Sequence, residues 1–195
     1  AQVVRAHIPY QEHLRRTLPK GWNPNAKHIE EICDHLDAVT RGEIDRLAIH
    51  MPPRHAKTET VTVRYPVYRL DDERALSVLV TGYNERFAQK LGRKTRKIAL
   101  EQGLTVAGDK AASDEWHTAE GGYLMARGVG SPPTGTGFKL ICIDDPVRKR
   151  EDAESEVYRE KVWDWYTDDL YTRLEPGGAI ILTMTLWHED DLGAR

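Results

Sequence analysis

The chain has 195 residues, of which 39% are hydrophobic and 30% charged. That length suits one domain with a core of its own, and two full domains would be a tight fit. No apolar run approaches the roughly 18 residues that suggest a membrane span, and the first residues lack the pattern of a signal peptide. The net charge of -3 argues against a protein that clamps DNA through a general positive excess. Cys33 and Cys142 lie far apart, which indicates free thiols in a reducing compartment.

Helices and strands alternate in the predicted order. In the first half of the chain we expect helices over 8–18 and 27–41, a strand over 47–51, a helix over 59–70, a strand over 75–81 and a helix over 84–101. A looser region follows over 103–138, with short antiparallel strands near 122–127. The last elements are a strand over 139–143, a helical stretch over 152–174 closed by 175–178, and a strand over 179–183. Pro66 should kink or end its helix, and Asn84 should cap the next. The near-continuous apolar strands are typical of a parallel sheet covered on both faces. We therefore predict an α/β fold with a mostly parallel central sheet flanked by helices.

We interpret the loop after the first strand as a variant phosphate-binding loop. The standard loop is a glycine-rich turn ending in Gly-Lys-Ser/Thr, whose backbone N–H groups hold phosphates, whose lysine neutralises them and whose hydroxyl binds magnesium. Lys57 and Thr58 supply the last two parts, but Met51 and Ala56 stand at the glycine positions. Alanine at 56 is acceptable if it has helical rather than left-handed angles. Arg54 adds a second cation, and the alternative is that Lys57 and Thr58 merely begin a solvated helix.

Asp144 and Asp145 follow the apolar strand over 139–143. An acid at the end of a strand can hold magnesium in phosphoryl transfer, and the next carboxylate can orient or deprotonate the attacking water. We assign these roles to Asp144 and Asp145 respectively, with Thr58 as the second magnesium ligand. Both acids should emerge at the sheet edge where Lys57 lies. A solvated Asp-Asp-Pro turn is the alternative.

Two further features are weaker. Thr185 follows the last strand, where a hydroxyl can sense the γ-phosphate and pass its loss to a moving segment. The helix over 84–101 also carries a basic set that is a candidate DNA contact, with a solvated face as the alternative. That set is Arg86, Lys90, Arg93, Lys94, Arg96 and Lys97.

Together these segments resemble the large terminase subunits of tailed bacteriophages and related prophages. The resemblance rests on four stretches in the order that family shows: 28–51 leading into Pro-Pro-Arg-His-Ala-Lys-Thr, 80–84 (Val-Thr-Gly-Tyr-Asn), 141–146 (Ile-Cys-Ile-Asp-Asp-Pro) and 172–192, which ends in Trp-His-Glu-Asp-Asp-Leu. It implies a P-loop NTPase of the RecA/ASCE-like kind, a magnesium-dependent ATPase that pumps double-stranded DNA into a procapsid. In that family a nuclease domain follows the ATPase domain.

The resemblance also implies a domain organisation and partners. We expect a single ATPase domain over 1–195, with an N-terminal helical, adenine-side segment over 1–45 and a P-loop core over 46–195. The nuclease is expected to be absent, so the chain should hydrolyse ATP without cutting DNA. Expected partners are double-stranded DNA, other copies in a ring (a pentamer on a portal), the small terminase subunit and the portal. The expected location is the host cytoplasm, transiently at the procapsid portal.

Further site residues follow from the same resemblance. Gln11 matches a glutamine that contacts adenine, with a surface glutamine as the alternative. The arginine that this family supplies in trans is assigned to Arg127, with Arg173 second, and Arg54 could serve in cis; surface salt bridging is the alternative. Many relatives have glycine at the position of Ala56 and glutamate at that of Asp145. The predicted nucleotide-binding residues are Gln11, Pro53, Arg54, His55, Ala56, Lys57, Thr58 and Glu59, and the predicted catalytic residues are Asp145, Lys57, Arg54, Arg127 and Thr185.

Two other functions stay open. The same fold could serve a helicase-like or other nucleic-acid-stimulated ATPase. It could also serve a nucleotide-binding assembly module without turnover.

Overall fold

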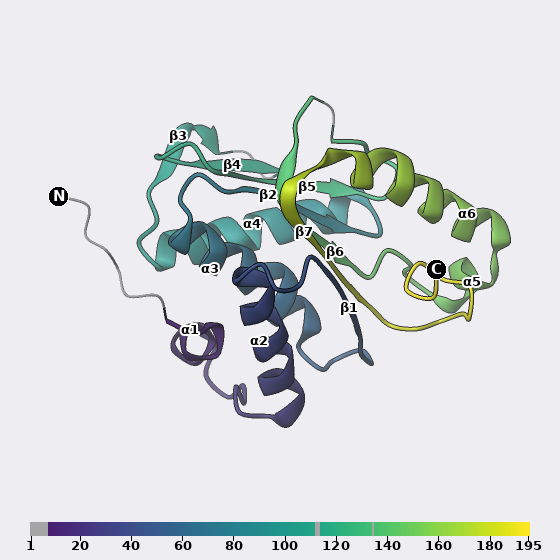
Figure 1. Ribbon diagram of the computed structural model, residues 1–195, viewed down its shortest axis with the longest axis horizontal. Coiled ribbons are helices and arrows are strands. Elements are labelled where there is room, and N and C mark those ends of the chain that lie inside the picture. Colours follow the sequence, from purple (N-terminus) through teal and green to yellow (C-terminus); the bar gives the residue numbers. More distant parts are fainter. Residues whose placement is uncertain (1–7, 112–113, 134) are drawn as a thin grey trace.

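The structure is a computed structural model that describes residues 8–111, 114–133 and 135–195. A seven-stranded sheet runs through the molecule, with helices on both sides of it (Figure 1). The strands are β1 (Arg46–His50), β2 (Ser77–Gly82), β3 (Val106–Ala111), β4 (Glu115–Thr118), β5 (Tyr123–Gly128), β6 (Phe138–Asp144) and β7 (Leu174–Met184). The helical elements are α1 (Tyr10–Thr17), α2 (Lys27–Thr40), η1 (Thr58–Arg64), α3 (Tyr65–Asp72), α4 (Glu85–Glu101), α5 (Arg150–Glu154), α6 (Glu156–Asp164), η2 (Trp165–Leu170) and η3 (Tyr171–Arg173).

The sheet is mostly parallel. Its strand order is β1-β7-β6-β2-β5-β4-β3, and the first five strands in that order are parallel to their neighbours. β4 and β3 complete the sheet in antiparallel pairing. The predicted α/β class with a mostly parallel central sheet flanked by helices is therefore confirmed. Because parallel strands end on one edge, the segments that follow β1, β7, β6 and β2 gather there.

Each face of the sheet has its own apolar core. Val78 and Val80 of β2 belong to a cluster that includes residues of α1 to α4. Leu79, between them, belongs to a second cluster with Val162 and Trp165 of α6 and η2. This alternation follows from the two-residue period of a strand. The apolar stripe predicted on α2 is buried as expected and comprises Ile29, Ile32, Cys33 and Leu36.

The helix after the loop begins as a π-helix. η1 ends at Arg64, and the chain continues as α3 with Pro66 in its first turn. Proline has no N–H to donate to the preceding turn, so a change of helical hydrogen bonding just before it is expected. Asn84 caps α4 as predicted, since its side chain accepts a hydrogen bond from the Phe87 N–H at 2.8 Å.

Three predicted boundaries differ in the structure. The turn expected over 175–178 lies inside β7, at a register shift between the pairs Phe138–Leu174 and Leu140–Ala179. The helical stretch expected over 152–174 is divided, because Ser155 ends α5 and caps α6. The segment near 122–127 pairs antiparallel with β4, as predicted, but also joins β2 in parallel.

The two cysteines, Cys33 and Cys142, are both free and buried. Within the described ranges, no helix has the length and apolar character needed to cross a membrane.

Candidate functional site

The loop between β1 and η1 contains two left-handed residues that are not glycine. Arg54 has φ of 67° and Ala56 has φ of 66°. The condition of helical angles at Ala56 is therefore not met, and the loop keeps the backbone that glycine would adopt at a cost of about 1–3 kcal/mol per residue. Ala56 is left-handed and Lys57 right-handed, and this alternation points successive N–H groups into a concave surface that can bind an anion.

Lys57 joins the segments that follow three different strands. Its side chain is 5% exposed, and its Nζ donates to Thr185 Oγ1 at 2.7 Å and to the Met51 carbonyl at 3.3 Å. The same ammonium lies 2.8 Å from Asp145 Oδ1. The structure thus brings Lys57, Asp145 and Thr185 together at the sheet edge, where the sequence predicted them.

Asp144 is enclosed by threonine hydroxyls. Thr58 Oγ1 donates to its carboxylate at 2.9 Å and 3.1 Å, Thr62 Oγ1 at 3.2 Å and Thr183 Oγ1 at 2.8 Å. Burial, and secondarily the charge of Asp145, raise the pKa of Asp144 to about 6, while the three hydroxyls act in the opposite direction. Among the described residues no lysine or arginine forms an ion pair with this carboxylate. A buried acid without a cation is costly, which favours a positive ion here.

The chemistry of these side chains fits magnesium. Hydroxyl and carboxylate oxygens are the hard donors that this ion prefers, and it is usually held by one or two protein ligands together with phosphate oxygens and water. Thr58 and Asp144 would hold it, as the sequence predicted. In the part of the chain that the structure describes, no three His, Cys, Asp or Glu residues form a metal cluster.

Asp145 links the ends of β6 and β7. Its backbone is left-handed, with φ of 41°, and its N–H donates to the Thr183 carbonyl at 2.8 Å. Its Oδ1 accepts from the Thr185 N–H at 2.9 Å. The side chain is 29% exposed, so water reaches this carboxylate although Asp144 beside it is fully buried.

Two residues of the site were missed by sequence reasoning, namely Thr62 and Thr183. Thr62 lies four residues after Thr58, and this spacing placed both hydroxyls on one side of a helix, a signal that could have been used. Thr183 pairs with Asp144 in the β6–β7 register, which depends on a strand pairing that the sequence does not show.

The prediction for Glu59 is wrong as far as its side chain is concerned. Glu59 is 5% exposed, lies 3.0 Å from Arg64 Nη2 and also pairs with Lys94 of α4. Since η1 is buried along most of its length, the residue after Thr58 points toward the core and α4. Its carboxylate therefore does not face the loop.

The arginines assigned to trans action lie away from this site within one chain. Arg127 Nη1 pairs with Asp114 at 3.0 Å, at the end of β5, which is two strands from β6. Arg173 directly precedes β7, and so lies at the opposite edge of the sheet from Asp145. Arg54 is on the loop itself, exposed, and has no carboxylate partner among the described residues.

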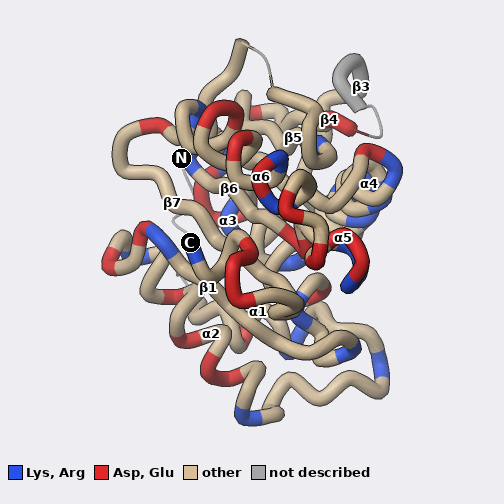
Figure 2. Tube along the Cα trace, turned by 90° about the vertical axis from the view of Figure 1, so that its right-hand side faces the viewer, with Lys and Arg blue, Asp and Glu red and all other residues tan. Residues whose placement is uncertain are grey.

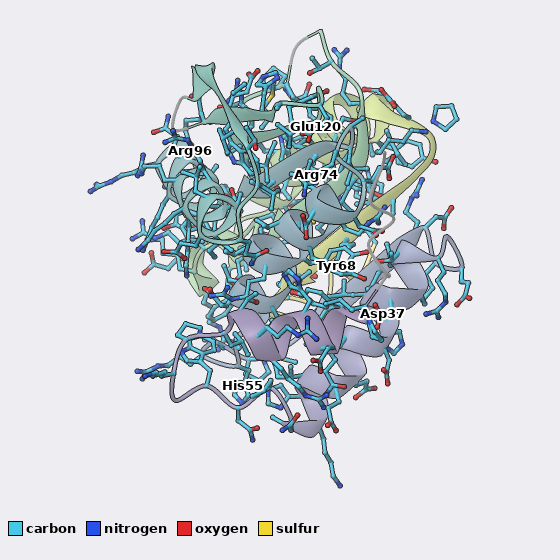
Figure 3. The ribbon with its side chains drawn as sticks, turned by 90° about the vertical axis from the view of Figure 1, so that its left-hand side faces the viewer. Asp37, His55, Tyr68, Arg74, Arg96 and Glu120 are labelled. Atoms are coloured by element: carbon cyan, nitrogen blue, oxygen red, sulfur yellow. The ribbon has the colours of Figure 1, made fainter. Side chains whose placement is uncertain are left out.

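The two N-terminal helices flank the loop. His55 stands edge-on to His28 of α2, with ring centroids 5.8 Å apart, and its Nδ1 lies 3.0 Å from the Pro53 carbonyl. Figure 3 shows His55 at the level of these helices, below Tyr68. Gln11 of α1 donates from its amide to Glu30 Oε1 of α2 at 3.2 Å. Gln11 is thus near the loop's side of the molecule, and its contact with adenine stays a prediction.

Comparisons with known proteins give few matches. No protein-family model matches the chain, and no curated protein does. Its fold is similar to that of the large terminase from a thermophilic bacteriophage in complex with ATP-γ-S, with a TM-score of 0.47 and 12% identity over 75% of this chain and 33% of that one. The same terminase in complex with ADP gives a TM-score of 0.43 and 10% identity over 76% of this chain and 37% of that one. The chain thus spans little more than a third of these proteins, and similarity at this level adds no argument about function.

Proposed function

We propose that this chain is the ATP-hydrolysing motor domain of a terminase that packages double-stranded DNA into a procapsid. ATP hydrolysis is supported by the convergence of Lys57, Thr58, Asp144 and Asp145 at one edge of a parallel sheet. These residues lie at the start of η1 and at the end of β6. A loop cation, a hydroxyl and two acids are the parts that phosphoryl transfer requires in P-loop enzymes. The sequence resemblance supports the coupling of this chemistry to DNA packaging.

Substrate binding is expected to change the partner of Lys57. A triphosphate presents more negative charge than one carboxylate, so it competes with Asp145 for the Lys57 ammonium. The left-handed turn at Arg54 and Ala56 supplies N–H groups for the same phosphates, and Arg54 supplies a second positive charge. Magnesium, when bound at Thr58 and Asp144, supplies the charge that neutralises the phosphate oxygens.

Hydrolysis follows from the freed carboxylate of Asp145. This group accepts a proton of the attacking water, whose oxygen forms the new bond to the γ-phosphorus while the bond to the bridging oxygen breaks. The Thr185 N–H holds Asp145 Oδ1 in place, and the Thr185 hydroxyl contacts Lys57. Thr185 is therefore suited to transmit loss of the γ-phosphate to the segment after β7.

Lys57→Ala is the direct test. We expect ATP turnover to fall by about 10³-fold or more, because positioning and charge neutralisation provide almost all of the catalysis in phosphoryl transfer. The measurement is phosphate release from ATP with magnesium, with and without duplex DNA. Lys139→Ala is a matched control, since Lys139 lies on β6 and bonds to the Pro176 carbonyl far from the loop.

Three experimental results would each argue against the proposed function. Hydrolysis that survives Lys57→Ala unaltered would contradict the assignment of the site. Strong strand separation by the wild-type chain would favour a helicase-like ATPase. Nucleotide binding without turnover, even in an assembled ring, would favour the assembly module.

A further inference from the structure

The exposed face of α4 carries a basic stripe. Its members are Arg86, Lys90, Arg93 and Lys97, all exposed and spaced i, i+4, i+7 and i+11 on one side of the helix. Lys94 pairs with Glu59 and Arg96 is half-buried, so these two do not belong to the stripe. Leu100 follows Lys97 on the same side and is 49% exposed, unusual for a large apolar residue of this chain. The stripe therefore ends in an apolar residue.

An acidic stripe of the same kind runs along α6 into η2. Its members are Glu156, Glu160, Asp164 and Asp168, at successive intervals of four residues. Within the described structure Glu160 pairs with Arg195 at 2.6 Å, whereas the other three acids have no cationic partner. Val157, beside the first acid, is 81% exposed. An exposed apolar residue therefore lies next to the start of this stripe.

The acidic stripe borders a cleft of about 690 Å³ between α6 and the loop at Gly130. Trp165 also lines this cleft, and its side chain is 3% exposed. Its Nε1 donor is buried and has no hydrogen-bond partner in the described structure. A buried N–H without an acceptor is unfavourable, so a partner that brings an oxygen into the cleft is favoured.

The two stripes match each other in length and order. At 1.5 Å per residue they span about 17 Å on α4 and about 18 Å along α6 and η2. If the two helices run antiparallel, the four acids meet the four bases in sequence, with Glu156 opposite Lys97 and Asp168 opposite Arg86.

We propose that α6 of one copy of this chain docks antiparallel against α4 of a second copy. Because α4 packs on one face of the sheet and α6 on the other, each copy offers both stripes at once. Figure 2 shows the blue positions of α4 and the red positions of α6 on different parts of the molecule. Such a contact is heterologous, so it joins copies head to tail and closes a ring if the rotation permits. The inference goes beyond ATP hydrolysis and does not depend on it.

A second copy fits both stripes better than DNA does. A nucleic acid would use the basic stripe alone and would be repelled by the acids, which would keep three carboxylates without a cation. A second copy satisfies both stripes. DNA on α4 is the competing outcome of the test.

Charge reversal on each stripe tests this contact. The antiparallel register pairs Asp164 with Lys90 and Asp168 with Arg86, so the variants are Asp164→Lys with Asp168→Lys, and Arg86→Glu with Lys90→Glu. Sedimentation velocity of the full chain without nucleotide should show self-association at about 50 mM salt that weakens toward about 500 mM. Each double variant should self-associate about tenfold or more weakly. An equimolar mixture of the two should associate like the wild type, because the reversed stripes match each other.

A charge-matched variant separates this contact from a general charge effect. Glu31→Lys with Asp34→Lys alters two exposed acids of α2 by the same net charge. It should self-associate like the wild type, because both of its stripes are unchanged. Three outcomes would overturn the proposal: a wild-type chain that stays monomeric at low salt, a mixture of stripe variants that fails to associate, or an α4 variant that loses duplex DNA binding while self-association is unchanged.

Discussion

The buried carboxylate of Asp144 lowers the stability of the fold, although the proposed function requires it. Its pKa rises from 3.8 to about 6 in the folded chain, chiefly through burial, so the folded state binds this proton more tightly than the unfolded state does. The free energy of unfolding therefore falls as the pH rises from 3.8 to about 6, and the cost is fully present above that range. A metal ion at Thr58 and Asp144 would remove this cost.

Asp144→Asn should stabilise the protein while it abolishes hydrolysis. Without nucleotide or metal we expect the free energy of unfolding at pH 8 to rise by up to about 3 kcal/mol, since the uncompensated charge is gone. The decline in stability between pH 3.8 and 6 should disappear as well. Urea unfolding at pH 4 and pH 8 measures both effects, with Asp34→Asn as an exposed control. A variant that is less stable than the wild type at pH 8 would contradict this account.

Three residues of the site have a backbone conformation that the sequence did not indicate. Arg54, Ala56 and Asp145 all have positive φ, and such strain persists only where the surrounding structure enforces it. Alanine has a steric cost in this conformation, which is why helical angles were the condition for accepting Ala56 in the loop. The hydrogen bonds around Lys57 and Asp145 override that local preference.

At the scale of elements, α1 is attached to the helix that follows the loop. Tyr10 is fully buried, and its hydroxyl donates to the Thr60 carbonyl in η1. Tyr10→Phe should lower the free energy of unfolding by about 1 kcal/mol, the usual net value of one such bond. Because α1 also carries the predicted adenine contact Gln11, KM for ATP should rise more than kcat falls. Steady-state kinetics measures this, and an unchanged KM would argue against an adenine-side role for α1.

Local patterns predicted those elements whose signals lie within a few residues of each other. The apolar stripe of α2, the Asn84 cap and the apolar run of β6 are signals of this kind, and the structure contains all three. The convergence of Lys57 with Asp145 could also be predicted, because parallel strands share an edge. The pairing of Thr183 with Asp144, the shift within β7 and the bond between Arg127 and Asp114 depend on contacts between distant segments, which no local pattern encodes.

For the whole molecule, the predicted trans role of Arg127 would make hydrolysis a property of an assembly. Within one chain Arg127 is turned toward Asp114, two strands from the acids, so it can assist catalysis only at a neighbour's site. An arginine supplied in trans is worth about 10³-fold or more in turnover. We therefore expect the ATPase rate per chain to rise steeply with protein concentration, and more so with duplex DNA. Mixing Lys57→Ala with Arg127→Ala should recover activity that neither variant has alone. The Lys57→Ala chain supplies an intact arginine, and the Arg127→Ala chain supplies an intact site. A rate per chain that is independent of concentration, with no recovery in the mixture, would assign catalysis to the single chain and leave Arg54 as its arginine.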